Sequence, residues 1–360
     1  MEELTQRFFE TLLRTQFLPP DRMQVYQRGL TERLVRHARA QVPFYRDSGR
    51  LDVIFTGDGR IDWQRWDEIQ VLTRSEAQAN AAALYAETMP PDCGGVGSGH
   101  TSGSTGKPLA FRVNGLVAAA NDATFERGLT WAGMSERLTV AWLRTPRPGE
   151  GQYPLGTLYT MRIRGAVREI HHLAVQTPIE QQGEWLGRLR PDVVMGYPGA
   201  LALLTHHLPR DLDRHRFHLA VCVGEVTTEE TRATIETGFR CPTMDVYSGS
   251  EFGVVAVEDR SAGRLFISEE TMLVEFRAGM ATPGRELAEI SVTPFYNYAM
   301  PLIRYSTGDL VEVDGQPAPD LRTLRRLIRV AGRQRNTFVL PSGRRWWPMI
   351  SSTRRIAQYL

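Results

Sequence analysis

Residues 100–108 run His100-Thr101-Ser102-Gly103-Ser104-Thr105-Gly106-Lys107-Pro108, and this stretch decides the fold class. Four hydroxyl side chains, two glycines and one lysine share one turn-forming segment. Glycine allows backbone conformations that point several N–H groups at one anion, and hydroxyl and ammonium groups add further donors. The stretch therefore predicts a loop that binds a polyphosphate, although a solvated Ser/Gly linker has the same composition.

The loop does not fit the P-loop of nucleoside triphosphatases. That motif, G-x-x-x-x-G-K-[ST], requires a glycine at position 101 and a hydroxyl residue directly after the lysine. The chain has Thr101 and Pro108 at these positions. Proline also disfavours the helix that a P-loop opens, because its ring clashes with the preceding turn. A kinase or ATPase of the P-loop class is therefore excluded.

The composition is that of an ordinary globular chain. Its 360 residues allow one large or two medium domains, and 42% of them are hydrophobic. A net charge of +2 does not favour a nucleic-acid partner, and no apolar run is long enough for a membrane span. Three cysteines without C-x-x-C spacing indicate reduced thiols, and the acidic N-terminus is unlike a signal peptide. We therefore expect a cytoplasmic protein, either monomer or homodimer.

Hydrophobic periodicity changes along the chain. Helical spacing dominates the first forty residues, and Thr73 has the features of a helix N-cap. The elements predicted after the loop are strands at 140–143, 193–195 and 219–223 and helices at 179–189 and 201–207. This alternation predicts an α/β fold with parallel strands. Later strands, which predict a smaller antiparallel or barrel-like portion, are expected at 265–268, 272–276, 287–293 and 310–313.

Four further segments follow the loop in a fixed order. They are Gly224-Glu225-Val226-Thr227-Thr228-Glu229, Asp245-Val246-Tyr247-Ser248-Gly249-Ser250-Glu251-Phe252-Gly253, Met300-Pro301-Leu302-Ile303-Arg304-Tyr305-Ser306-Thr307-Gly308-Asp309-Leu310 and Gly332-Arg333-Gln334-Arg335. Together with the loop they resemble the adenylate-forming superfamily of acyl-CoA synthetases, nonribosomal adenylation domains and luciferases. The segments Gln41-Val42-Pro43-Phe44-Tyr45-Arg46 and Leu72-Thr73-Arg74 are similar to the phenylacetate-CoA ligase branch.

This resemblance implies a domain organisation. Residues 1–331 would form a large, multi-lobed N-terminal domain of mixed α/β sheets with a small β-barrel-like portion. Residues 332–360 would hold the hinge and the beginning of a small C-terminal domain, either truncated or naturally reduced. Relatives bring a lysine from that domain to the first half-reaction, and this chain has no counterpart that we can name.

The resemblance also implies an activity. The chain would be an ATP- and Mg²⁺-dependent ligase that converts a small aromatic carboxylic acid into an acyl-adenylate and releases pyrophosphate. The acyl group would then pass to CoA, or to an amine or hydroxyl acceptor in a biosynthetic pathway. The alternative is a non-catalytic nucleotide- or acyl-binding relic of the same fold. Adenylation brings two anions together, so the site must position the reactants and neutralise charge.

By this resemblance the motif residues bind ATP. The residues that would hold the β- and γ-phosphates are Thr101, Ser102, Gly103, Ser104, Thr105, Gly106 and Lys107. Tyr247 would lie along one face of adenine, and the residues lining its other side would be Gly224, Glu225 and Val226. Ser250 would contact the α-phosphate, Asp309 the ribose hydroxyls, and Arg333 the ribose or α-phosphate. Glu251 would hold Mg²⁺, and the catalytic residues would be Lys107, Ser250 and Glu251.

The acid would bind beside Gly196-Tyr197-Pro198-Gly199, with Tyr197, Pro198 and Gly249 as substrate residues. An aromatic slot for an aryl acid would be built with Phe125, Trp131, Trp142 and Tyr153, although these rings equally suit the core. The histidine pairs at 171–172 and 206–207 are expected at the surface or at helix ends, because adenylation starts from an ionised carboxylate and needs no base. We expect Arg304 and Tyr305 to support a turn.

Overall fold

The computed structural model describes residues 1–101, 108–134, 137–147, 149–163, 165–282, 285–316 and 320–333, together with the backbone of 338–339 and 345–346. Its helices are α1 (Glu2–Thr15), α2 (Pro20–Gln41), α3 (Pro43–Ser48), α4 (Arg74–Ala79), α5 (Gly115–Trp131), α6 (Ile179–Leu189), α7 (Pro198–Leu204) and α8 (Glu229–Phe239). The strands before residue 200 are β1 (Val96–His100), β2 (Ala110–Asn114), β3 (Leu138–Arg144), β4 (Thr157–Ile163), β5 (Ala166–Ala174) and β6 (Val193–Gly196). The remaining strands are β7 (Leu219–Val223), β8 (Thr243–Gly249), β9 (Gly253–Asp259), β10 (Arg264–Ile267), β11 (Met272–Thr282), β12 (Arg285–Pro294), β13 (Tyr305–Asp314), β14 (Arg326–Arg333), β15 (Phe338–Val339) and β16 (Arg345–Trp346).

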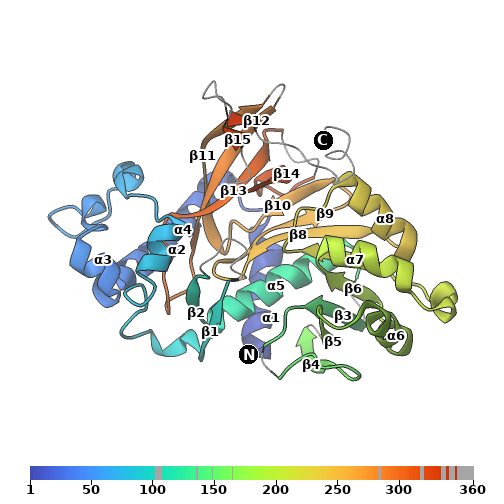
Figure 1. Cartoon of the computed structure of the whole chain (residues 1–360). Helices are drawn as coiled ribbons and strands as arrows, with labels where there is room; N and C mark the ends of the chain where they lie inside the picture. The colour runs from blue at the N-terminus through green and yellow to red at the C-terminus, as the bar shows by residue number, and fades with distance from the viewer. Residues whose placement is uncertain are drawn as a thin grey trace.

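A single 12-stranded sheet dominates the fold, in the order β11-β12-β13-β14-β10-β9-β8-β7-β6-β3-β5-β4 (Figure 1). Strands β5, β3, β6, β7 and β8 are parallel, and β4 pairs antiparallel with β5 at the edge. From β8 onward every pair in this sheet is antiparallel. The α/β class with parallel strands is therefore confirmed, and the antiparallel strands of the last third continue the same sheet.

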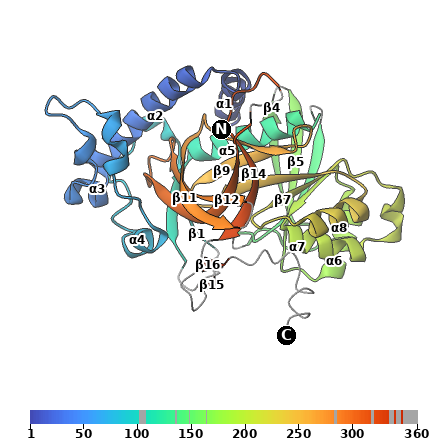
Figure 2. The same cartoon turned by 90° about the horizontal axis from the view of Figure 1, so that it is seen from above.

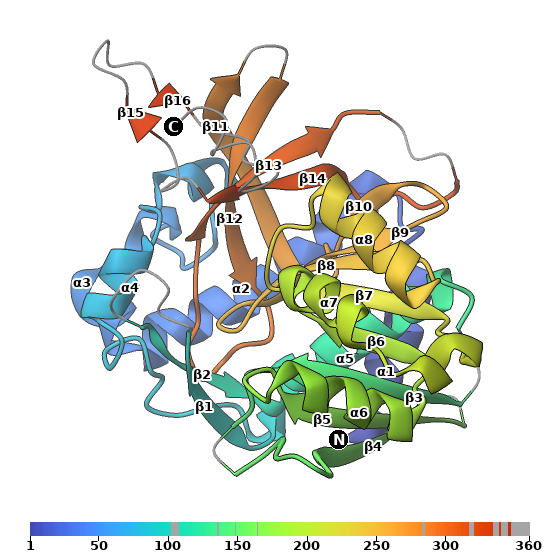
Figure 3. The same ribbon diagram turned by 45° about the vertical axis from the view of Figure 1, so that its right-hand side comes forward.

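Helices cover both faces of the parallel half, with α6, α7 and α8 on one face and α5 and α1 on the other (Figure 3). The alternation of β3 explains this layering, because successive side chains of a strand point to opposite faces. Ala141 and Leu143 pack into the core below α6–α8, whereas Val140 and Trp142 pack with Phe125 on the α5 side. Both faces are buried, as expected for parallel strands.

Two buried ion pairs attach α5 to strand β5 and to the turn between β10 and β11. Arg127 pairs with Glu270, and Glu126 pairs with Arg168 on β5. All four side chains are almost fully inaccessible to solvent. Burial raises the pKa of Glu270, and the Arg127 guanidinium opposes that shift. Because removing one partner would leave an unpaired buried charge, these pairs fix the position of α5 strongly.

The N-terminal helices α2, α3 and α4 lie to one side of the antiparallel strands (Figure 2). The main core cluster joins α2 and α3 to strands β9–β14, with fully buried Leu34, Tyr45, Leu72 and Tyr305. The three cysteines are free and buried. Within the described ranges, no helix is both long enough and apolar enough to cross a membrane.

Candidate active site

The two strands that flank the Ser/Gly loop form a hairpin. β1 and β2 pair antiparallel, with His100 opposite Ala110. Thr101 closes the base twice: its N–H donates to the Leu109 carbonyl at 3.0 Å, and its Oγ1 accepts from the Leu109 N–H at 2.9 Å. A strand follows Pro108 where a P-loop would begin a helix, which agrees with the exclusion of that motif. Outside the described residues lie Ser102, Gly103, Ser104, Thr105, Gly106 and Lys107, and their contacts with phosphate stay predictions.

Arg74 joins the base of this loop to Glu251. Its Nη2 donates to Thr101 Oγ1 at 2.6 Å, and its Nη1 donates to Glu251 Oε1 at 3.1 Å. The Tyr305 hydroxyl donates to the same Glu251 oxygen at 3.1 Å. The Glu251 side chain is only 5% exposed. Four residues from distant parts of the sequence therefore share one hydrogen-bonded cluster, in which the second carboxylate oxygen makes no hydrogen bond to a described residue.

Sequence reasoning assigned no role to Arg74, although one signal was available. Arg74 is the first residue of α4, where the helix dipole favours acidic side chains. A positive charge at the start of a helix is locally unfavourable. An arginine at this position therefore suggests a carboxylate partner from another part of the chain. Thr73 caps α4 as predicted, since its side chain accepts from the Glu76 N–H. Tyr305 supports Glu251 directly, a contact that its sequence motif did not reveal.

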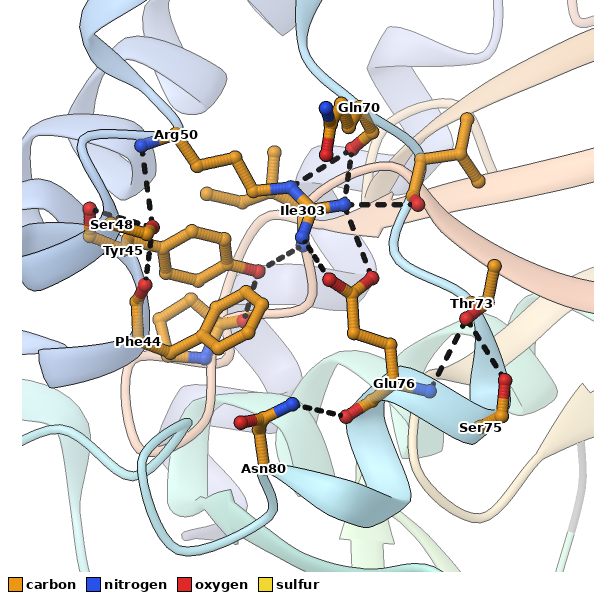
Figure 4. Close-up of polar contacts among 12 residues, drawn as sticks. Phe44, Tyr45, Ser48, Arg50, Gln70, Thr73, Ser75, Glu76, Asn80 and Ile303 are labelled. Atoms are coloured by element: carbon orange, nitrogen blue, oxygen red, sulfur yellow. Dashed lines mark hydrogen bonds and ion pairs between the residues drawn. The ribbon is translucent and has the colours of Figure 1, made fainter.

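A second polar cluster fixes α4 in place (Figure 4). Arg50 Nη1 donates to Glu76 Oε1 at 2.6 Å, and its Nη2 donates to Glu76 Oε2 at 3.2 Å. The Arg50 side chain also donates to the carbonyls of Gln70 and Val71. The Arg50 side chain is 8% exposed, so this is a largely buried ion pair. It holds the segment that leads into α4 and therefore the backbone that carries Arg74.

Tyr247, Asp309 and Arg333 form a third cluster near Glu251. The Tyr247 hydroxyl donates to Asp309 Oδ2 at 2.8 Å and to Thr307 Oγ1 at 3.2 Å. Asp309 and Arg333 are register partners on β13 and β14, with 3.5 Å between Oδ1 and Nε. Burial raises the pKa of Asp309, while the bond from Tyr247 and the charge of Arg333 lower it. Three of the predicted nucleotide residues therefore lie together.

Tyr197 and Gly224 meet at the carboxyl ends of neighbouring parallel strands. Gly224 follows β7 with φ +80°, a conformation that favours glycine. A Cβ on Gly224 would lie 2.8 Å from Tyr197 Cε1, so a side chain there would displace the tyrosine ring. The predicted acid residue and the predicted adenine segment are thus in direct contact. Pro198 is the buried first residue of α7, and Glu225 and Val226 are exposed.

The turn between β8 and β9 carries Gly249, Ser250 and Glu251. A Cβ on Gly249 would lie 2.2 Å from Phe252 Cζ, so the Phe252 ring closes over this glycine. Ser250 is exposed, with its side chain accessible to a ligand, while Glu251 is buried. The sequence pattern therefore produces two neighbouring residues with opposite exposure.

The predicted aromatic slot is not assembled as one unit. The Tyr153 hydroxyl donates to Glu184 of α6, and the Tyr153 ring packs with the α6–α8 core, on the opposite face from Trp142 and Phe125. Trp131 ends α5, packs on Phe266 and borders the same core cluster as Phe125 and Trp142. The slot therefore loses Tyr153, because this ring packs on the other face of the sheet, while Phe125, Trp131 and Trp142 border one core cluster.

His172 corrects another expectation, since it lies on β5 and is only 5% exposed. Burial, with a smaller contribution from Arg144, lowers the pKa of His172 to about 4. His206 and His207 occupy a short turn after α7, as expected. Arg304 supports its turn: it has φ +52° and donates to the Trp66 and Ile69 carbonyls and to Asp67.

Comparisons with known proteins agree with this geometry. No protein-family model matches the chain. It is 26% identical over 222 residues to protein CapK of Staphylococcus aureus, covering 60% of this chain and 48% of CapK. It is 25% identical over 255 residues to the phenylacetate-coenzyme A ligase of Pseudomonas putida, covering 67% of this chain and 55% of the ligase. With the phenylacetate-coenzyme A ligase of Escherichia coli K12 it shares 26% identity over 337 residues, 89% of this chain and 73% of that one.

Solved structures extend the comparison to the fold. A 2-hydroxyisobutyryl-CoA ligase in the postadenylation state superposes with a TM-score of 0.70 at 16% identity, over 92% of this chain and 72% of that chain. An open conformation of the same ligase gives 0.64 at 15% identity, over 89% and 77%. The chain spans about half the length of the first two curated relatives that it matches. The predicted resemblance is confirmed: the sequence is similar to phenylacetate-coenzyme A ligases, and the fold is that of adenylate-forming acyl-CoA ligases.

Proposed function

We propose that this chain activates a carboxylic acid with ATP, forming an acyl-adenylate and releasing pyrophosphate. The observation that carries the proposal is the bridge from Thr101 through Arg74 to Glu251. It brings the base of the phosphate-type loop to a buried carboxylate that can hold Mg²⁺ beside the triphosphate. Similarity to phenylacetate-coenzyme A ligases supports the same chemistry.

ATP would lie across the clusters already described. The loop residues from Thr101 to Lys107 would hold the β- and γ-phosphates. Asp309 would accept from the ribose hydroxyls beside Arg333, and Tyr247 would border the adenine opposite Gly224, Glu225 and Val226. Ser250, whose side chain is exposed, would reach the α-phosphate. Support comes from the contacts that link Tyr247, Asp309 and Arg333.

Glu251 fits a Mg²⁺ ion that is shared with phosphate. Mg²⁺ is commonly held by one or two carboxylates together with substrate phosphates. Glu251 Oε1 is occupied by Arg74 and Tyr305, and Oε2 makes no hydrogen bond to a described residue. A bound Mg²⁺ would neutralise charge on the phosphates.

The acid would lie against Tyr197 and Pro198, close to Gly249. Tyr197 touches Gly224, which places an aromatic ring next to the nucleotide segment. A small aromatic acid suits this ring, and relatives named for phenylacetate support that class. The acyl group would then pass to CoA, as the names of the relatives suggest, or to an amine or hydroxyl acceptor. Residues 332–360 would contribute the hinge for that second step.

Pyrophosphate exchange with a panel of carboxylic acids tests the first step. We expect exchange of labelled pyrophosphate into ATP with at least one acid. Glu251→Gln should reduce that exchange at least about a hundredfold, because the neutral amide is a poor Mg²⁺ ligand. The control is Glu68→Gln, which changes an exposed carboxylate that pairs only with Arg65 on the surface.

Two negative outcomes of these experiments would be informative. Full exchange by Glu251→Gln would overturn the magnesium assignment and leave the reaction intact. Binding of ATP and acid in calorimetry without any exchange would favour the non-catalytic relic. Mass detection of the acyl-adenylate, followed by competition between CoA and amines, would then identify the acceptor.

A further inference from the structure

A group of aromatic and charged side chains lies at the carboxyl ends of β3 and β5. Trp142 on β3 and His172 on β5 are register partners, so they point to the same face of the sheet. Their rings lie edge to face with centroids 5.0 Å apart. Arg144, two residues after Trp142, stacks its guanidinium over the indole at 4.9 Å. This is the face that α5 covers, because Arg168 on the same side of β5 pairs with Glu126.

Two residues from the neighbouring segment complete the group. Tyr159 on β4 packs on His172 with ring centroids 4.6 Å apart, and its hydroxyl donates to Glu150 Oε1 at 2.6 Å. Glu150 Oε2 lies 3.5 Å from Arg144 Nη2. The five residues, Trp142, Arg144, Glu150, Tyr159 and His172, are called the β3–β5 cluster below. Of these five residues, only Trp142 was predicted from the sequence to contact the acid.

The cluster contains buried polar atoms that make no hydrogen bond to any described residue. These atoms are Trp142 Nε1, Arg144 Nε, Glu150 Oε2 and His172 Nδ1. Buried polar groups in native proteins are nearly always hydrogen-bonded, and leaving them unpaired is costly. The apolar core elsewhere on β3 has no such accumulation, since Ala141 and Leu143 are simply packed. Four buried polar atoms without a hydrogen bond, on adjacent side chains, indicate a binding site.

The chemistry of these atoms limits the ligand. Trp142 Nε1 and Arg144 Nε are N–H donors with fixed directions, so they require an oxygen acceptor. Glu150 Oε2 is an acceptor that has the charge of Arg144 Nη2 at 3.5 Å but no hydrogen bond, so it can still accept one from a ligand. Burial lowers the pKa of His172 to about 4, so its imidazole is neutral near pH 7 and offers one donor and one acceptor nitrogen. A hydroxyl group meets this set, because it accepts from N–H donors and donates to a carboxylate at once.

The position of the cluster relates it to the acid. Trp142 and Met195 are register partners on the parallel strands β3 and β6. Arg144 and Tyr197, each two residues further on, thus lie side by side at the ends of these strands, and Tyr197 in turn touches Gly224. The carboxyl ends of β7, β6, β3 and β5 therefore carry one continuous row from the nucleotide segment to the β3–β5 cluster. In open α/β sheets, ligands bind at the carboxyl ends of the strands. An acid whose carboxylate faces the nucleotide would extend its other end along this row.

We propose that the β3–β5 cluster binds the distal end of the acid substrate, and that this end carries a hydroxyl group. The inference rests on the proposed function and adds the substrate class to it: a hydroxylated acid in place of a plain aryl or alkyl acid. Trp142 and Arg144 donate to the hydroxyl oxygen, and the hydroxyl donates a hydrogen bond to Glu150 Oε2. The faces of Trp142 and Tyr159 flank the carbon skeleton.

Matched acids test this assignment by equilibrium binding. The probes are 4-hydroxyphenylacetate against phenylacetate and 4-hydroxybutyrate against butyrate, titrated into the full chain by calorimetry with α,β-methylene-ATP present. We expect the hydroxylated member of at least one pair to bind about tenfold more tightly. Trp142→Phe keeps an aromatic ring but removes the N–H donor, and should abolish most of that preference. Equal or tighter binding of the plain acid in both pairs would overturn the proposal.

Two further variants keep the test decisive. Trp185→Phe is the matched control, because Trp185 Nε1 donates to the Leu155 carbonyl on the opposite face of the sheet. This variant should prefer the hydroxylated acid as strongly as the wild type does. If Trp142→Phe does not fold, Glu150→Gln supplies the second measurement, and an unchanged preference there would overturn the proposal. Binding of a hydroxy acid without pyrophosphate exchange would overturn only the proposed function. Exchange with plain acids and no hydroxyl preference would overturn only this inference.

Discussion

Arg74 and Glu251 are 177 positions apart in the sequence, yet their guanidinium and carboxylate groups lie 3.1 Å from each other. The same guanidinium holds Thr101 at the base of the Ser/Gly loop. A single side chain thus couples the segment predicted to bind phosphate with the carboxylate predicted to bind Mg²⁺. The coupling depends on α4, which the Arg50–Glu76 pair fixes in place.

Arg74→Ala should weaken ATP binding about tenfold, because Thr101 loses a charged donor and Glu251 loses its counter-charge. Arg74→Lys should be intermediate, since one ammonium group is a point charge without the fork that reaches two oxygens. Calorimetric titration of ATP, with and without Mg²⁺, measures both. Wild-type affinity in Arg74→Ala would show that the bridge does not position the nucleotide.

Arg50→Ala should lower the free energy of unfolding by about 2 kcal/mol, because it leaves Glu76 and two backbone carbonyls without their donor. Urea unfolding followed by tryptophan fluorescence measures the change. Arg65→Ala is the matched control: Arg65 pairs with Glu68 on the surface, where an ion pair contributes little. Equal effects in the two variants would contradict the structural role of Arg50.

Gly224→Ala should both strain the backbone and displace Tyr197. The φ of +80° accounts for about 1 kcal/mol of lost stability, and the contact with the ring adds a loss of acid affinity. Gly263→Ala separates the two effects. Gly263 has φ +60°, and no atom lies within 4 Å of a Cβ built there. We therefore expect both variants to lose stability and only Gly224→Ala to raise the KM for the acid.

His172 should make the protein less stable at acidic pH. Its pKa is about 4 in the folded chain against 6.5 when unperturbed. The unfolded state therefore binds more protons between these values, and the free energy of unfolding falls as the pH drops from 6.5 to 4, by up to about 3 kcal/mol. His172→Asn should flatten this part of the curve. Above pH 7 the free energy of unfolding should depend on pH in the same way in the wild type and in the variant. If the variant loses as much stability as the wild type below pH 6.5, His172 is not the group responsible.

The sequence predicted correctly those helices and strands that have a clear hydrophobic pattern within their own residues. The helix α6 and the strand β7 coincide with their predicted ranges, because an amphipathic period and a short apolar run are local signals. Strands β4 and β5 were not predicted, since β5 carries Arg168 and His172 inward. Burial of Arg168 depends on Glu126, which lies 42 positions away. A partner so distant leaves no periodic signal in the sequence.

The residues of the candidate site also fall into those that the sequence predicted and those that it did not. Residues within motifs, such as Tyr247 and Asp309, were found because their spacing resembles a known family, and the structure brings the two together. Arg74 and the cluster members Arg144, Glu150 and Tyr159 were missed because their roles arise from contacts between residues distant in sequence or on neighbouring strands. Tyr153 was grouped with the wrong face, since its position in a turn carries no information about the side of the sheet that it covers.

The contacts of Tyr305 bear on how the site forms during synthesis. Its hydroxyl reaches Glu251, and its strand pairs with Leu72, whose N–H and C=O bond to Arg304 and Ser306. Such long separations in sequence make assembly slow, since non-local contacts require large loops to close first. Domains fold as units once their chain has been made. A nascent chain therefore cannot complete the hydrogen bonds of Glu251 until Tyr305 has left the ribosome.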